Sequence, residues 1–139
     1  MKNILNIENK LLKANRLSAF ENSDWKSGVR NKAGVYVIWS KRGNKSAQYV
    51  GETTSLIERF KDLGSWRNHT FTRKIKNKYN LNTPESIRSK INSLYEISFI
   101  EIDFGRKEIE EYLIYKWETH KHPKFNKSSP RYESAQKNA

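Results

Sequence analysis

The sequence contains no cysteine. A chain without thiols has no disulfide framework, no zinc–thiolate site and no cysteine nucleophile, and we expect a reducing, cytoplasmic location. No apolar run approaches the roughly 20 residues that a helix needs to cross a bilayer. Residues 1–16 lack the apolar core and the small-residue cleavage site of a signal peptide. These absences argue against the secreted disulfide-rich and membrane-spanning classes.

Acidic residues are scarce: 15 Asp and Glu stand against 27 Lys and Arg, which gives a formal net charge of +12. The stretch from Gly64 to Asn82 has no acidic residue at all, and its basic members are Arg67, Arg73, Lys74, Lys76 and Lys78. Such a block suits a polyanion, because each neutralised phosphate releases a counterion. We predict that these five residues bind DNA. A solvated basic face and a membrane surface are the weaker alternatives.

Hydrophobic periodicity predicts one α+β domain of modest core size. The expected helices cover residues 4–20 (broken near Asn15), 56–63, 69–79, 84–92 and 106–120, and the expected strands cover 34–40, 48–51 and 94–103. We divide the chain into an N-terminal helix and loop extension (1–32), a central domain (33–126) and a basic tail expected to be mobile (127–139). Trp25 in the loop is expected to be a packing anchor rather than a base-stacking platform.

The strand over residues 34–40 alternates between two kinds of side chain. Val35, Val37 and Trp39 lie on one face, while Tyr36 and Ile38 lie on the other. A polar turn and a second short strand follow, which predicts an antiparallel hairpin.

The helix after this hairpin has clear boundary signals. Thr53, Thr54 or Ser55 can cap its start, and Gly64 ends it. Farther along, Thr83 and Pro84 have the pattern of a cap followed by proline in the first turn of another helix.

Glu110 lies on the apolar side of the last expected helix, together with Leu113 and Trp117. A carboxylate on a buried face is costly unless it is paired or bound to a cation. Two explanations remain open: Glu110 binds a hard cation such as Mg²⁺, or it forms a salt bridge with Arg59 or a lysine. Glu108 is a competing ligand. His120 and His122 near the helix end are expected to cap it or contact phosphate rather than bind a metal.

Four elements in order resemble the GIY-YIG nuclease family. They are the tripeptide 34–36, the tripeptide 49–51 after twelve intervening residues, Arg59 eight residues beyond Gly51, and the run from Glu110 to Ile114 followed by Pro123 and Asn126. The resemblance covers most of the chain, from about Gly34 to Asn126, and is nearest to small stand-alone members. Either tripeptide alone would be a weak signal, whereas the ordered set is fairly specific.

The resemblance implies a three-stranded antiparallel sheet flanked by helices and an endonuclease that hydrolyses DNA with one Mg²⁺ or Mn²⁺. Glu110 would be the metal ligand, and Tyr36 would orient or deprotonate the attacking water. Tyr49 would hydrogen-bond in the same site, Arg59 would stabilise the phosphoryl oxygens and Asn126 would brace the site. A homodimer or a protein partner is left open as a source of specificity. The alternative is a nucleic-acid-binding module on this fold without cleavage.

The sequence departs from the family pattern at two positions. Glu52 follows the second tripeptide, where many members have Lys or His, and Leu63 stands one turn after the arginine, where others have His. His69 is the candidate replacement, with a helix cap as its alternative role. If the register of the last helix shifts by one residue, Glu111 replaces Glu110 as the ligand.

Overall fold

The computed structural model describes residues 2–18, 28–64, 66–121 and 124–126. Trp25, His122, Pro123 and the tail 127–139, which figure in the sequence predictions, lie outside these ranges.

The centre of the molecule is a four-stranded antiparallel sheet. Its strands are β1 (Leu17–Ser18), β2 (Gly34–Ser40), β3 (Ala47–Thr53) and β4 (Tyr95–Glu101), in the order β1-β4-β2-β3. The prediction of three strands is therefore one short. β1 has only two residues, which pair with Ile97 and Glu96 of β4. No periodicity can be read from two residues, and the sequence predicted that they continue the first helix.

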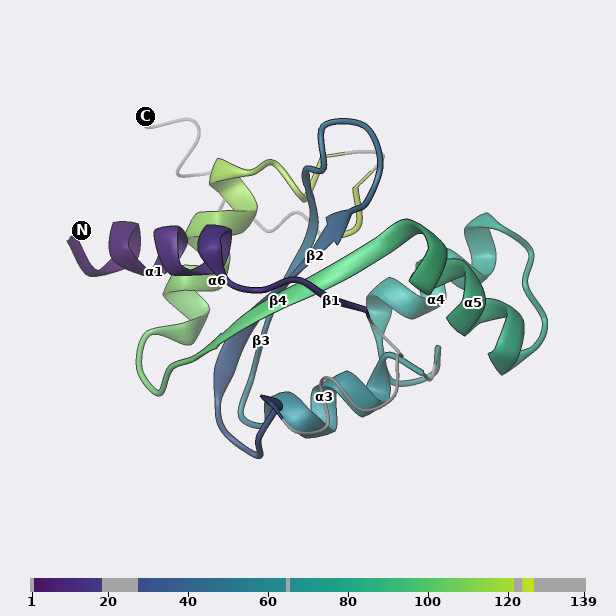
Figure 1. The fold of residues 1–139 in the computed structure, drawn as a ribbon, viewed down its shortest axis with the longest axis horizontal. Helices are drawn as coiled ribbons and strands as arrows, with labels where there is room; N and C mark the ends of the chain where they lie inside the picture. The colour runs from purple at the N-terminus through teal and green to yellow at the C-terminus, as the bar shows by residue number, and fades with distance from the viewer. Residues whose placement is uncertain (1, 19–27, 65, 122–123, 127–139) are drawn as a thin grey trace.

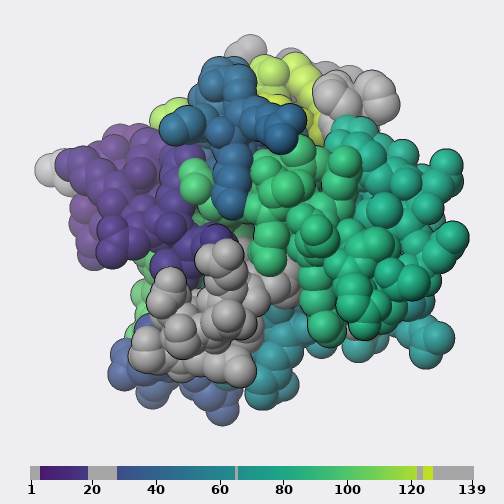
Figure 2. Space-filling model, turned by 45° about the vertical axis from the view of Figure 1, so that its right-hand side comes forward, coloured from purple at the N-terminus to yellow at the C-terminus, as the bar shows by residue number. Residues whose placement is uncertain are grey.

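Helices cover both faces of the sheet. They are α1 (Lys2–Lys13), α3 (Leu56–Asp62), α4 (Thr70–Lys78), α5 (Pro84–Leu94) and α6 (Arg106–Lys116). In Figure 1, α1 and α6 lie on one side of the sheet, and α3, α4 and α5 lie on the other. Figure 2 shows α1 (purple) separated from α4 and α5 (teal and green), with the 40–46 loop (blue) projecting above. The α+β class predicted from the sequence is confirmed.

Each face of the sheet has its own hydrophobic cluster, as the alternation along β2 predicted. The cluster under α1 and α6 includes Val35, Val37, Trp39, Leu11, Val50, Ile109, Leu113 and Ile114. The cluster under α3, α4 and α5 includes Tyr36, Ile38, Tyr49, Leu56, Phe60, Phe71, Ile75, Tyr95, Ile97 and Phe125. Consecutive β2 side chains thus enter two separate cores.

Helix ends follow the predicted signals in two places and differ in a third. Ser55 accepts a hydrogen bond from Glu58 N and caps α3, and Thr83 with Ser86 forms a reciprocal capping box at α5. The last helix was predicted to run to about His120 but ends at Lys116. Glu118 has a φ of 55°, and Thr119 N donates to Ile114 O. This is a Schellman motif in which glutamate occupies the left-handed position usually held by glycine.

The N-terminal segment is joined to the rest of the molecule by specific contacts. Lys116 Nζ donates to Glu8 Oε1 at 2.8 Å, which links α1 to α6. Arg16 pairs with Glu96 at 3.2 Å and lies 4.0 Å from the ring centroid of Trp39. Residues 2–18 therefore complete one core of the central domain. Within the described ranges, every helix is too short or too polar to cross a membrane.

Candidate active site

Three side chains from three elements meet at the phenolic oxygen of Tyr36. His69 Nε2 lies 2.9 Å from this oxygen, and Arg59 Nε donates to it at 3.4 Å. His69 Nδ1 accepts a hydrogen bond from Phe71 N at 3.2 Å. The proton of a neutral imidazole must then be on Nε2, so His69 also donates to Tyr36. Two donors reach the phenolic oxygen, and the Tyr36 hydroxyl also interacts with Tyr49, so the buried phenol is engaged within the cluster.

Local structure explains why these groups converge. Tyr36 is on β2, Arg59 on α3, and His69 is the N-cap of α4, so one imidazole both caps a helix and binds the tyrosine. Gly51 of β3 lies opposite Tyr36 in the sheet, and a Cβ on Gly51 would collide with the Tyr36 ring. Glycine at this position therefore lets the phenol lie across β3.

Tyr49 completes the buried part of the cluster. Its ring centroid lies 6.2 Å from that of Tyr36 and 5.5 Å from that of His69. Burial raises the pKa of Tyr49, and the positive charge of Arg59 acts against this rise. The two tyrosines named by the motif are therefore neighbours.

Burial also sets the protonation of the other groups. It raises the pKa of Tyr36 well above its ordinary value, despite the opposing effect of Arg59. Burial, followed by the charge of Arg59, lowers the pKa of His69 to about 3. At neutral pH the cluster consists of two neutral phenols, a neutral imidazole and one guanidinium.

Arg59 is held in place but reaches the surface. Its NH1 donates to Asn68 O at 2.8 Å and lies 3.6 Å from Asp62 Oδ2. The side chain is 26% exposed, so its charge is accessible to a ligand. One explanation for Glu110 was a salt bridge with Arg59. Among the described residues, the carboxylate that forms an ion pair with Arg59 is that of Asp62 and not that of Glu110.

Glu110 lies at the edge of the sheet. Its Oε2 accepts a hydrogen bond from Glu52 N of β3 at 2.9 Å. Burial first, and the charge of Glu52 next, raise the pKa of Glu110 to about 7. The charge of Glu110 in turn raises the pKa of Tyr36 and Tyr49. The carboxylate is thus within electrostatic range of the phenols, although it accepts its hydrogen bond from the backbone of β3.

Glu110 is a candidate single carboxylate ligand for a divalent cation. The described residues contain no group of three His, Asp or Glu side chains that could enclose a metal ion. Mg²⁺ commonly binds through one or two carboxylates and keeps waters and phosphate oxygens in its other positions. One half-buried carboxylate is compatible with that mode of binding, and a cation would also favour its ionised form.

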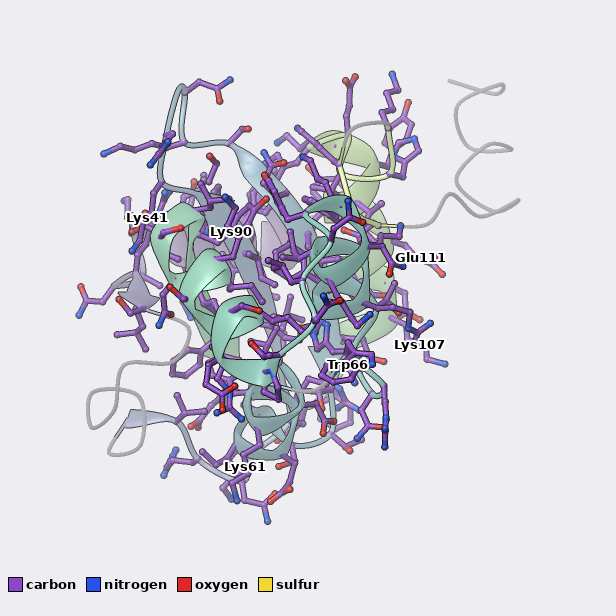
Figure 3. The ribbon with its side chains drawn as sticks, turned by 90° about the vertical axis from the view of Figure 1, so that its right-hand side faces the viewer. Lys41, Lys61, Trp66, Lys90, Lys107 and Glu111 are labelled. Atoms are coloured by element: carbon purple, nitrogen blue, oxygen red, sulfur yellow. The ribbon has the colours of Figure 1, made fainter. Side chains whose placement is uncertain are left out.

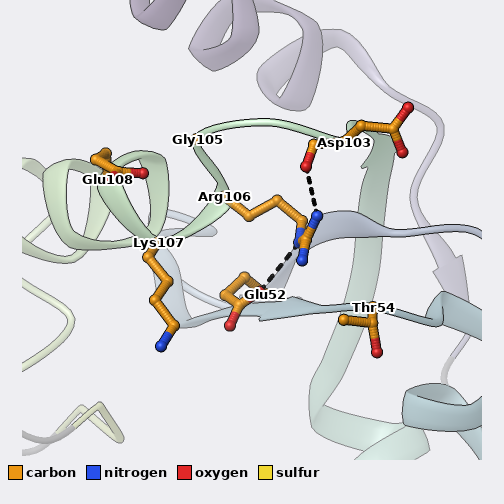
Figure 4. A pocket seen from close by; sticks show the side chains of 7 residues that line it. All are labelled: Glu52, Thr54, Asp103, Gly105, Arg106, Lys107 and Glu108. Atoms are coloured by element: carbon orange, nitrogen blue, oxygen red, sulfur yellow. Dashed lines mark hydrogen bonds and ion pairs between the residues drawn. The ribbon is translucent and has the colours of Figure 1, made fainter.

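An open pocket of about 340 Å³ adjoins this edge (Figure 4). Its lining residues are Glu52, Thr54, Asp103, Gly105, Arg106, Lys107 and Glu108. Arg106 Nε donates to Glu52 Oε2 at 3.2 Å, and both side chains are about four-fifths buried. Glu52 is therefore neutralised by a basic residue from α6. The sequence analysis missed Arg106, because the two residues are 54 positions apart in the chain.

Asn126 pairs with the outer edge of β3. Its Oδ1 accepts from Val50 N at 2.7 Å, and its Nδ2 donates to Val50 O at 2.9 Å. Phe125 N donates to Gln48 O at 3.2 Å. The chain at 125–126 thus continues the hydrogen-bonding pattern of the sheet beside Tyr49.

The five basic residues predicted to bind DNA have different surroundings. Arg73 donates to Trp66 O and Arg67 O, and Lys74 donates to Phe125 O. Arg67 and Lys76 lie near the ring of Trp66, and Lys78 lies near the rings of Tyr79 and Phe125. Arg73 and Lys74 therefore hold backbone segments, which the sequence did not indicate.

The other candidate ligands lie apart from the phenol cluster. Glu108 is an exposed residue of α6 that lines the open pocket. Glu111 is half-buried on the same helix. His120 Nδ1 lies 3.3 Å from Ile114 O, next to the end of α6.

No protein-family model matches this chain, and no match was found among curated proteins or among solved structures.

Proposed function

We propose that this protein is a divalent-metal-dependent endonuclease of the GIY-YIG type that hydrolyses DNA phosphodiester bonds. The observation that carries this proposal is the cluster of Tyr36, Tyr49, His69 and Arg59, with Glu110 at the adjacent strand edge. Phosphoryl transfer needs positioning and charge neutralisation more than covalent chemistry, and these groups provide both.

Arg59 and Tyr36 have distinct roles in this proposal. In the reaction the oxygen of water bonds to phosphorus, the bond to one bridging oxygen breaks, and the departing oxygen takes up a proton. The exposed part of the Arg59 guanidinium binds the phosphoryl oxygens. Tyr36 is a neutral phenol, because burial raises its pKa, and we assign its hydroxyl to orienting the water or a phosphoryl oxygen.

His69 and Asn126 are positioning residues. The Nε2–H of His69 fixes the phenolic oxygen of Tyr36, while its Nδ1 binds the backbone of α4. Asn126 holds β3 at Val50, next to Tyr49. Glu110 is the residue that would hold Mg²⁺ or Mn²⁺. Such an ion would supply charge neutralisation at the phosphate and promote ionisation of a bound water.

The test is cleavage of supercoiled plasmid DNA with Mg²⁺ or Mn²⁺. We expect the wild type to nick the plasmid and Glu110→Gln to lose at least about 100-fold in rate, since this substitution removes the ionisable group. Glu111→Gln is the matched control, because it removes a carboxylate one residue away on the same helix. Equal rates for the wild type and Glu110→Gln would refute the assignment. Loss confined to Glu111→Gln would move it by one residue.

A non-catalytic nucleic-acid-binding module is the second candidate. The observation favouring it is the Glu52–Arg106 ion pair, which stands at a position where related nucleases often have a free base. Tight, salt-dependent DNA binding without cleavage by any divalent ion would support this candidate. A single cluster cuts one strand per visit, so a double-strand break would need a homodimer, a partner or two successive nicks.

A further inference from the structure

A second hollow lies between the loop after α3 and the start of α5. Its volume is about 320 Å³, and its lining residues are Gly64, Trp66, Arg67, Pro84 and Arg88. This is at the lower end of the range for pockets that take small ligands. Figure 3 looks onto the side formed by α4 and α5, where Trp66 lies between Lys61 and Lys107 in the view.

The aromatic wall of this hollow is held firmly. Trp66 is half-buried and packs against the core under α3, α4 and α5. Arg73 Nε donates to its carbonyl at 3.1 Å. The charged ends of Lys76 and Arg67 lie 5.5 and 5.8 Å from the ring centroid, near the limit of cation–π contact. Both cations lie over the indole ring at long range, so positive charge is already placed where an anionic nucleotide would approach the ring.

Two guanidiniums make the hollow attractive to an anion. Arg67 and Arg88 are both exposed, and neither forms an ion pair with a carboxylate of the described chain. The Nε and NH2 atoms of Arg88 lie 3.3 Å from the position that a Cβ of Gly64 would occupy. Glycine at 64 thus gives the guanidinium room to lie against the backbone at the floor of the hollow.

The hollow and the proposed active site are built on one short stretch of chain. Trp66 and Arg67 are followed by Asn68, whose carbonyl binds Arg59, and by His69, which binds Tyr36. Two residues span at most about 7 Å of extended chain. A ligand in the hollow would therefore lie close to a phosphate held at Arg59.

We propose that Trp66, Arg67 and Arg88 form a subsite for one unpaired nucleotide of a DNA strand, with its base stacked on Trp66 and its phosphate held by the two arginines. A tryptophan can stack only on a base whose face is free, and bases in a regular duplex cover each other. The subsite therefore directs the protein to DNA with an unpaired base near the cut. Its location relative to the scissile bond rests on the proposed nuclease function, but its binding preference does not.

The experiment measures binding by fluorescence anisotropy of the full chain in EDTA, where cleavage does not contribute. One probe is a fully paired DNA hairpin, and the other is the same hairpin with one unpaired nucleotide. We expect the wild type to prefer the second probe by about tenfold, the size of one base–aromatic stack. Trp66→Ala should reduce this preference to less than twofold, and Trp66→Phe should keep most of it.

Arg88→Ala has a matched control in Arg42→Ala, which removes one exposed positive charge from the loop between β2 and β3. We expect Arg88→Ala to weaken binding of the unpaired probe several-fold more than Arg42→Ala does. Equal binding of both probes by the wild type, or equal weakening of both by Trp66→Ala, would overturn the subsite. Tighter binding of an RNA hairpin with the same unpaired nucleotide would overturn its assignment to DNA.

The two proposals fail independently in this design. If the wild type never cuts DNA but its probe preference depends on Trp66, the subsite stands and the nuclease is refuted. If cleavage requires Glu110 but the preference ignores Trp66, the nuclease stands and the subsite is refuted.

Discussion

The two faces of the sheet differ in what their side chains can do. The face under α1 and α6 is mainly aliphatic and is bordered by ion pairs such as Lys116 with Glu8. The face under α3, α4 and α5 is rich in aromatic rings. The ring of Phe71 makes edge-to-face contacts with Tyr95 and Phe125, at ring-centroid distances of 5.0 and 4.9 Å. Tyr36, Tyr49 and Phe60 belong to this second face, where Tyr36 binds His69 and Arg59, whereas Glu110 comes from α6 on the first face and reaches the edge of the sheet at Glu52 N.

Strand β2 contributes side chains to the hydrophobic cores on both faces of the sheet. Val35 and Val37 of β2 enter the aliphatic core, while Tyr36 between them enters the aromatic core and binds His69. Since neighbouring positions on a strand point to opposite faces, stability and chemistry are assigned to alternate residues. Substitutions on the two faces should therefore separate the two properties.

The largest expected effect is on the aromatic face. Tyr36→Phe removes the hydroxyl that we assign to orienting the reacting groups, and we expect cleavage to slow by about 10² to 10⁴-fold. It also leaves the buried Nε2–H of His69 and the partly buried Nε–H of Arg59 without this acceptor, at a stability cost of about 1–3 kcal/mol. Rates of plasmid nicking, measured well below the midpoint of thermal unfolding, separate the two effects.

Tyr95→Phe is the control for this substitution. It removes another largely buried phenol from the same face, and the hydroxyl of Tyr95 has no part in the Tyr36 hydrogen bonds. A tenfold or greater loss of rate in this control would mean that loosening the aromatic core is enough to stop catalysis. The special role of Tyr36 would then be unsupported.

An intermediate effect is expected on the aliphatic face. Leu11→Ala creates a cavity at a fully buried position of α1 and should lower the free energy of unfolding by about 2–5 kcal/mol. Chemical denaturation measures this loss. Leu12→Ala, on the same helix but 44% exposed, should lose well under half as much. Both variants should retain the wild-type cleavage rate while folded, and a slower rate would contradict the division between the faces.

The smallest effect concerns the pH dependence of stability. Glu110 has a pKa of about 7 in the folded protein and an ordinary, lower value when unfolded. The contribution of Glu110 to the free energy of unfolding is therefore fully present below its unfolded pKa. This contribution is lost as the pH rises through about 7. Relative to Glu110→Gln, the metal-free wild type should lose on the order of 1 kcal/mol between pH 5 and pH 8.5.

Denaturation curves at the two pH values, with Glu111→Gln as the control, measure this difference. Adding Mg²⁺ should reduce the pH-dependent loss in the wild type, because a bound cation favours the ionised carboxylate, and should leave Glu110→Gln unchanged. An identical pH dependence in the wild type and Glu110→Gln would show that the carboxylate is not perturbed.

Much of the fold could be predicted because the relevant signals are local. The alternation from Val35 to Trp39 specified both faces of β2, and the Thr83-Pro84 pair specified the start of α5. The α+β class followed from these periodic segments. What periodicity could not provide was β1, because a two-residue strand exists only through its pairing with β4.

For the candidate site, too, only contacts between residues close in sequence could be predicted. The spacing of Tyr36, Tyr49 and Arg59 on a hairpin and the following helix made their convergence predictable, because few residues separate them. The Glu52–Arg106 pair and the carbonyl contacts of Arg73 and Lys74 depend on the tertiary structure. The left-handed Glu118 was also hidden, because glutamate gives no sign of a helix stop.

Asn126 has a consequence for self-association. Strand β3 is an edge strand, and exposed backbone groups on such strands invite another chain to add to the sheet. Here Gln48 O and both backbone groups of Val50 are occupied by residues 125 and 126, and Glu52 N is occupied by Glu110. A second copy that extended the sheet here would have to displace the residues that frame Tyr49, so the same contacts that shape the site also cover this edge of the sheet against edge-to-edge association.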